Sequence, residues 1–250
     1  MAASKKGTTL AQKKANPESS PAASGSTTGN AAALRIGAVA LWLVAIGFEV
    51  LALLFFKETI KLNFLSPMWL AIIALVLDLV CVIVGSVLWK KSNRIDPASE
   101  KSPVKFWLWN NMGLIACTLA FIPFVILALT DKKADKKSKA IVSVVAVVAL
   151  LIGGLASYDW DPVSREDLEA AQKAIPGDVY WTKSGTVYHT NREECYHIRN
   201  KTDEELFVGS VAEAFEENLT RLCSNCAKLD NIEGVRTDKY DPFAETTPAE

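Results

Sequence analysis

Four long apolar blocks follow one another through the middle of the chain, with short polar loops between them. They cover residues 33–56, 68–89, 106–130 and 140–157. Each block is about long enough to cross a hydrocarbon core of roughly 30 Å as an α-helix. Soluble proteins also bury apolar helices, but four such blocks in a row joined by lysine-rich loops favour membrane helices. The pattern therefore predicts a four-helix transmembrane domain over residues 32–157, with the lipid bilayer as a partner.

The segments on either side of the apolar blocks are polar. Residues 1–31 are mostly Ala, Ser, Thr, Gly, Pro and Lys with one Leu, a composition that buries too little apolar surface to offset chain entropy and predicts a disordered tail. Residues 158–178 predict a linker with a short helix, because Ser164 and Asp167 have the spacing of a helix N-terminus and Pro176 follows. Residues 231–250 predict a flexible tail.

A compact unit is predicted between the linker and this tail, over residues 179–230. Residues 179–182 and 186–189 flank a Lys-Ser-Gly turn and favour a β-hairpin. Residues 205–209 favour another strand, and residues 210–219 a helix that begins with a capping box of Ser210 and Glu213. The fold class expected is thus an all-α membrane domain with a small α+β domain at the C-terminal end.

The distribution of charge predicts an orientation but no nucleic-acid partner. The formal net charge is −1, so no basic face is implied. Lysine and arginine are frequent in the N-terminal tail and the second loop and sparse in the first loop, which predicts a cytoplasmic N-terminus. The third loop, residues 131–139, carries five lysines and contradicts this simple rule. Because four spans return the chain to its starting side, both termini are expected in the cytoplasm.

Both histidines and three of the five cysteines lie in the C-terminal unit. A unit of about fifty residues usually needs a disulfide, a metal or a partner to stay folded. Cys223 and Cys226 have the spacing of a zinc knuckle, and Cys195 is the remaining thiol of the unit. His189 or His197 would complete four ligands. A structural zinc site is favoured over a catalytic or sensing metal, and over a Cys223–Cys226 disulfide in an oxidising exterior.

The segments "WTKSGTVYHTNREECYHI" and "FVGSVAEAFEENLTRLCSNC" resemble a small bacterial module similar to the metal-binding domain of the DNA-repair protein Ada. The resemblance covers about a fifth of the chain, and it implies His189, Cys195, Cys223 and Cys226 as ligands of a structural zinc ion. His197 has no counterpart in that pattern. The membrane part is similar to small multi-span proteins of Gram-positive bacteria, which implies a bacterial plasma membrane. The repair activity is not implied, because a histidine replaces one ligand cysteine.

Two acidic side chains lie inside the apolar blocks, Glu49 in the first and Asp78 near the centre of the second. Acids at that depth are costly and suggest proton or cation coupling, unless neighbouring helices hydrogen-bond them. No catalytic motif is present, so the chain is not expected to be an enzyme. The favoured function is a membrane protein whose zinc module binds a protein partner. The alternatives are an ion-coupled transporter that uses Asp78 and Glu49, and a metal or redox sensor.

Overall fold

The computed structural model describes residues 7–15, 27–60, 65–132 and 135–238. The chain divides into two compact units. The helical unit comprises Gly29–Ser92 and Pro103–Asp159, and the α+β unit comprises Met1–Thr28, Asn93–Ser102 and Trp160–Glu250. The α+β unit is therefore assembled from three separate stretches of the chain.

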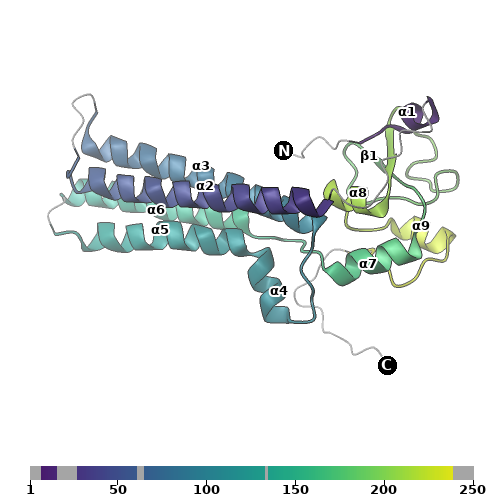
Figure 1. Ribbon diagram of the computed structural model, residues 1–250. Coiled ribbons are helices and arrows are strands. Elements are labelled where there is room, and N and C mark those ends of the chain that lie inside the picture. Colours follow the sequence, from purple (N-terminus) through teal and green to yellow (C-terminus); the bar gives the residue numbers. More distant parts are fainter. Residues whose placement is uncertain (1–6, 16–26, 61–64, 133–134, 239–250) are drawn as a thin grey trace. The chain divides into compact units, whose positions relative to one another are not determined.

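Long helices build the helical unit: α2 (Thr27–Phe56), α3 (Pro67–Ile95), α5 (Met112–Thr130) and α6 (Lys136–Ser157), with the short α4 (Pro103–Asn110) before α5 (Figure 1). The four long ones are long and apolar enough to cross a membrane, over Asn30–Phe56, Pro67–Ile95, Met112–Thr130 and Lys136–Ser157. This is consistent with the multi-pass membrane protein that the apolar blocks predict.

The side chains of these helices are arranged as in a bundle that faces lipid. Large apolar residues point outward, such as Ile36 with 70% of its surface exposed and Leu155 with 63%. Small residues pack inside, and a Cβ atom added to Gly153 would lie 2.8 Å from Sγ of Cys117. Small residues let helices approach closely where lipid supplies no hydrophobic driving force between them. An outward apolar surface of this extent indicates a membrane environment.

The third apolar block is not a single helix. The sequence predicts one crossing over residues 106–130, but α4 ends at Asn110 and α5 begins at Met112. The side-chain amides of Asn110 and Asn111 donate to the carbonyls of Phe106 and Trp107, each at 3.0 Å. The break thus lies at two consecutive asparagines, which are poorer helix formers than the apolar residues around them.

A two-stranded antiparallel sheet lies at the centre of the α+β unit. Strand β1 (Val179–Thr182) pairs with β2 (Leu206–Gly209). The helices of the unit are α1 (Leu10–Ala15), α7 (Arg165–Ala174), α8 (Val211–Glu216) and α9 (Ser224–Leu229). The predicted capping boxes are confirmed: the Ser164 hydroxyl accepts from the Asp167 N–H, and that of Ser210 from the Glu213 N–H.

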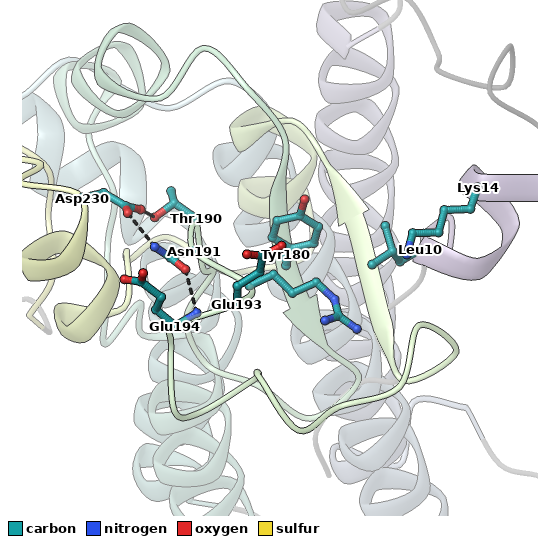
Figure 2. Close-up of a pocket in the computed structure, with 9 residues that line it drawn as sticks. Leu10, Lys14, Tyr180, Thr190, Asn191, Glu193, Glu194 and Asp230 are labelled. Carbon is teal, nitrogen blue, oxygen red and sulfur yellow. Dashed lines mark hydrogen bonds between the residues drawn. The ribbon is translucent and has the colours of Figure 1, made fainter.

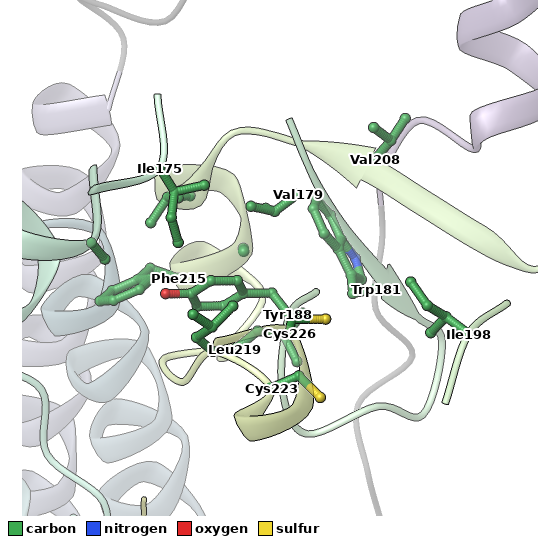
Figure 3. Packing of buried hydrophobic residues seen from close by; sticks show 14 of the residues in the cluster. Ile175, Val179, Trp181, Tyr188, Ile198, Val208, Phe215, Leu219, Cys223 and Cys226 are labelled. Atoms are coloured by element: carbon green, nitrogen blue, oxygen red, sulfur yellow. The ribbon is translucent and has the colours of Figure 1, made fainter. Parts of the chain in front are cut away.

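The core of this unit extends beyond residues 179–230. Val163 and Ala171 belong to it. Ile175 does as well (Figure 3), so the segment expected as a linker contributes to this core. At the C-terminal side, Ile232 and Val235 pack against the same core, and the Leu222 N–H donates to the Arg236 carbonyl at 2.9 Å. Part of the expected flexible tail, residues 231–238, thus contacts the folded unit, while residues 239–250 lie outside the described part.

Within the N-terminal tail that the sequence predicts to be disordered, residues 7–15 include α1 and a β-bridge between Thr9 and Phe207. Leu10 is buried in the core of the α+β unit with 8% of its surface exposed. A small domain has little apolar area of its own, so each added apolar contact matters to its stability. Residues 1–6 and 16–26 lie outside the described residues.

Candidate metal centre

The four side chains predicted as ligands lie together inside the α+β unit. His189, Cys195, Cys223 and Cys226 are all buried, and their ligand atoms lie within 4.8 Å of one another. Nδ1 of His189 is 3.5 Å from Sγ of Cys195 and 3.7 Å from Sγ of Cys226. Sγ of Cys195 is 4.0 Å from Sγ of Cys223. This cluster could hold a metal ion.

The separations fit a small tetrahedral ion. Bonds of about 2.3 Å to sulfur and about 2.1 Å to nitrogen place two sulfur ligands about 3.8 Å apart, and a sulfur and a nitrogen about 3.6 Å apart. The distances between His189 and Cys195, between His189 and Cys226, and between Cys195 and Cys223 each lie within a few tenths of an ångström of these values. Three sulfurs and one imidazole nitrogen are also a typical donor set for zinc.

The predicted hairpin between residues 179–182 and 186–189 is formed at one residue pair. Strand β1 pairs with β2, and Tyr180 of the same strand also makes an isolated antiparallel bridge with His189, with N–H to carbonyl distances of 2.7 and 2.8 Å. The preceding residue, Tyr188, forms a parallel bridge with Leu222. Its carbonyl accepts from the Cys223 N–H at 2.8 Å. Residues 188–189 therefore connect the sheet to the segment that carries Cys223.

The two cysteines of the zinc-knuckle spacing lie at the start of α9. Cys223 is the N-cap residue of that helix, and Cys226 lies in its first turn. Cys195 lies in a turn in which its carbonyl accepts from the N–H groups of Ile198 and Arg199. The turn thus supplies the thiol of Cys195, and the start of α9 supplies those of Cys223 and Cys226, which together make the three sulfur ligands.

His197 is the histidine that the cluster leaves out. Its side chain is exposed, and its ring centre lies 6.1 Å from that of His189. The sequence pattern alone allowed either histidine. The bridge between His189 and Tyr180, which lies within the predicted hairpin, holds the backbone at His189, and Nδ1 of His189 is near the thiols of Cys195 and Cys226.

A hydrogen-bonded clamp beside the cluster was not expected from the sequence. Asp230, the residue after α9, accepts from the Thr190 hydroxyl and, at 2.9 Å, from the Asn191 side chain (Figure 2). The Asn191 side chain in turn accepts from the Glu194 N–H at 2.9 Å. These bonds tie the chain between His189 and Cys195 to the helix of Cys226, as outer partners of metal ligands commonly do.

Burial sets the protonation of most groups in the cluster. It lowers the pKa of His189 to about 4, helped by nearby His197, so the imidazole is neutral at pH 7 and can offer a lone pair. Burial raises the pKa of Cys226 to about 12 and also raises that of Cys223.

Cys195 differs from the other two thiols. Burial raises its pKa, but hydrogen bonds from the Asn225 side chain, the His197 backbone and the neighbouring thiols outweigh that effect and lower it. Of the three thiols, Cys195 is therefore the one whose pKa is lowered. A bound metal cation would favour the thiolate form of all three.

The arrangement favours holding an ion rather than reacting through it. Four protein ligands complete a tetrahedron, whereas catalytic zinc keeps a position open for water or substrate. A pocket of about 430 Å³ lies beside the cluster, lined by residues that include Tyr180, Glu193, Glu194 and Asp230 (Figure 2).

Comparison of the chain with known protein families, with curated proteins and with solved structures finds no match.

The acidic residues of the helical unit form a second, separate feature. Asp78 is fully buried, and among the described residues neither of its carboxyl oxygens has a hydrogen-bond partner. Glu49 lies close enough for the two groups to interact electrostatically, and it accepts from the Phe124 N–H at 3.1 Å. The polar side chains of Asn110, Asn111 and Thr118, in the third apolar block, donate to backbone carbonyls of the preceding helical turn.

Proposed function

We propose that the protein is a bacterial multi-pass membrane protein whose α+β unit is held together by a structural zinc ion and serves as an interaction element at the membrane surface. The spacing of the four buried ligand atoms of His189, Cys195, Cys223 and Cys226 carries the zinc assignment. The likeness of the quoted segments to the Ada metal-binding module supports it. A closed site favours a structural role over a catalytic one.

The assembly of the α+β unit supports one proposed membrane orientation. It combines the N-terminal segment, the loop Asn93–Ser102 and the C-terminal region. Within it, the Arg165 N–H donates to the Ala98 carbonyl at 3.0 Å, and Nε of Arg94 donates to the Asn218 side chain at 2.8 Å. If α2, α3, α5 and α6 each cross the bilayer, these three stretches all lie on one side. The lysine and arginine distribution favours the cytoplasmic side.

Metal content tests the zinc assignment. The purified full-length protein is expected to contain about one zinc ion per chain by elemental analysis, as a single tetrahedral site requires. The His189→Ala variant should lose most of it, because three thiolates alone leave the tetrahedron incomplete. The matched variant His197→Ala should keep it. Zinc retained by His189→Ala, or lost by His197→Ala, would reverse the ligand assignment.

Ion coupling through Asp78 is a second candidate function, favoured by one observation. A carboxyl group that is fully buried among apolar helices and lacks a hydrogen-bond partner among the described residues is unusual in a purely structural bundle. Glu49 on α2 supplies a second carboxyl group that interacts with it. Together they could take up a proton or a small cation within the bundle.

Liposomes that contain the protein test this second candidate. A proton or cation flux should be seen with the parent protein and should fall to the level of empty liposomes with Asp78→Asn, which keeps the shape of the side chain but cannot ionise. Glu58→Gln, at an exposed acid near the end of α2, should leave the flux unchanged. Equal fluxes for the parent and Asp78→Asn would remove the transport hypothesis.

A further inference from the structure

The N-terminal segment, residues 7–15, lies along the edge of β2 that β1 leaves free. Thr9 and Phe207 form an antiparallel bridge, and the Val208 N–H donates to the Thr8 carbonyl at 3.0 Å. The Ala11 N–H donates to the Asp203 carbonyl at 3.1 Å. A segment about 200 positions away in the sequence thus satisfies backbone groups of an edge strand, which is the geometry of strand addition to a sheet.

The segment is also anchored by apolar contacts. Leu10, the leucine of the polar N-terminal region, is buried with 8% of its surface exposed. Gly7 lies against the Trp181 indole, so that an added Cβ atom would be only 3.2 Å from Cζ2. Leu10 thus fills the core, whereas at Gly7 the backbone lies so close to the indole ring that an added Cβ atom would require the ring to shift slightly.

Two ion pairs fix the position of the segment. Nζ of Lys13 is 2.6 Å from Asp178, and Nζ of Lys14 is 2.7 Å from Asp203. Nη2 of Arg192 also lies 2.7 Å from Asp203. Because these groups are partly exposed, their main effect is on register and specificity rather than on affinity.

The local sequence prepares the segment for this contact. The Thr9 N–H donates to the Gln12 side chain at 3.1 Å, and the Gln12 N–H donates to the Thr9 hydroxyl at 3.3 Å, a reciprocal capping pair. This pair ends the extended stretch at Thr9 and starts α1 at Leu10. The leucine therefore faces the core, and the two lysines follow one turn later.

We propose that the α+β unit has a specific binding site for the N-terminal segment of its own chain, formed by the free edge of β2, the Trp181 ring and the carboxylates of Asp178 and Asp203. The segment is an intramolecular ligand that closes the sheet edge and helps to line the pocket beside the metal cluster through Leu10 and Lys14. The site deepens the proposed interaction function of the unit, and none of its contacts involves a metal ligand.

Hydrogen exchange of the full-length protein in lipid nanodiscs tests the docking. The amides of Thr8–Ala11 and Val208 should be protected in the parent. Leu10→Asp should raise their exchange about tenfold or more, because the anchor is lost, while the exchange of α5 and α6 stays unchanged. Lys13→Asp should raise it less, and the pair Lys13→Asp with Asp178→Lys should restore protection. Lys183→Asp, the same charge change at an exposed turn of the unit, serves as the control.

Three outcomes would overturn the proposal. They are rapid exchange of the segment in the parent, no response to Leu10→Asp, and protection that disappears on dilution, since an intramolecular contact does not depend on concentration. Zinc measured in the same samples separates this proposal from the metal assignment. If the amides of the N-terminal segment are protected but no zinc is found, the docking proposal holds and the metal assignment fails. If zinc is found but these amides are not protected, the metal assignment holds and the docking proposal fails.

Discussion

The Cys226→Ser variant is expected to lose its metal and to unfold the α+β unit while the helical unit stays folded. Structural zinc contributes about 10–16 kcal/mol of binding free energy in small zinc domains, which is as large as the whole stability of many domains. Cys226 is fully buried in the core of the unit, so its replacement removes a ligand and also places a hydroxyl among apolar groups.

Hydrogen exchange resolved by segment would measure this effect in the full-length protein. The amides of β1, β2 and α8 should exchange as in an unfolded chain, and a zinc chelator added to the parent should reproduce the pattern. Cys81→Ser is the matched control, because Cys81 lies in α3 of the helical unit, away from the cluster. A unit that keeps its protection in Cys226→Ser would show that apolar packing alone holds it together.

The sequence predicted those features that depend on local pattern. Block length and apolar composition locate the candidate spans. A segment that crosses a membrane must hydrogen-bond its own backbone N–H and C=O groups, so it forms a helix, and the helix must be long enough to span the bilayer. The capping boxes at Ser164 and Ser210 depend on residues three positions apart, and they formed as expected. The spacing of Cys223 and Cys226 likewise brings two thiols together within one turn of helix.

Features that depend on distant pairing could not be predicted. The pairing of β1 with β2 joins segments that are far apart in the sequence and is decided by the whole core, whereas the bridge between Tyr180 and His189 lies within the predicted hairpin. One leucine in a polar stretch gives no periodic signal, so the docking of Leu10 was missed. The break before α5 lies inside an apolar block, so apolar content alone does not reveal it.

Substitutions of Tyr188 are expected to have opposite effects on the stability of the α+β unit. Its ring is fully buried and lies against Phe215, with ring centres 6.3 Å apart (Figure 3). Its hydroxyl is buried without a hydrogen-bond partner among the described residues, and burial raises the pKa of the phenol well above its usual value, with the charge of Asp167 adding to the effect. The ring therefore stabilises the fold, whereas the hydroxyl does not.

Tyr188→Ala should lower the free energy of unfolding by about 3–5 kcal/mol, the range for large-to-small changes at buried aromatic positions. Tyr188→Phe should leave it unchanged or raise it by about 1 kcal/mol, because an unsatisfied polar group leaves the core. Denaturant midpoints of the β1 and β2 amides, compared between the two variants, measure both effects. A loss of more than about 1 kcal/mol in Tyr188→Phe would mean that the hydroxyl makes a stabilising bond.

The two substitutions should also differ in their effect on the metal cluster, because the Tyr188 carbonyl accepts from the Cys223 N–H and the next residue is His189. Loss of the aromatic ring in Tyr188→Ala should therefore weaken zinc binding, whereas Tyr188→Phe, which keeps the ring, should bind zinc as the parent does.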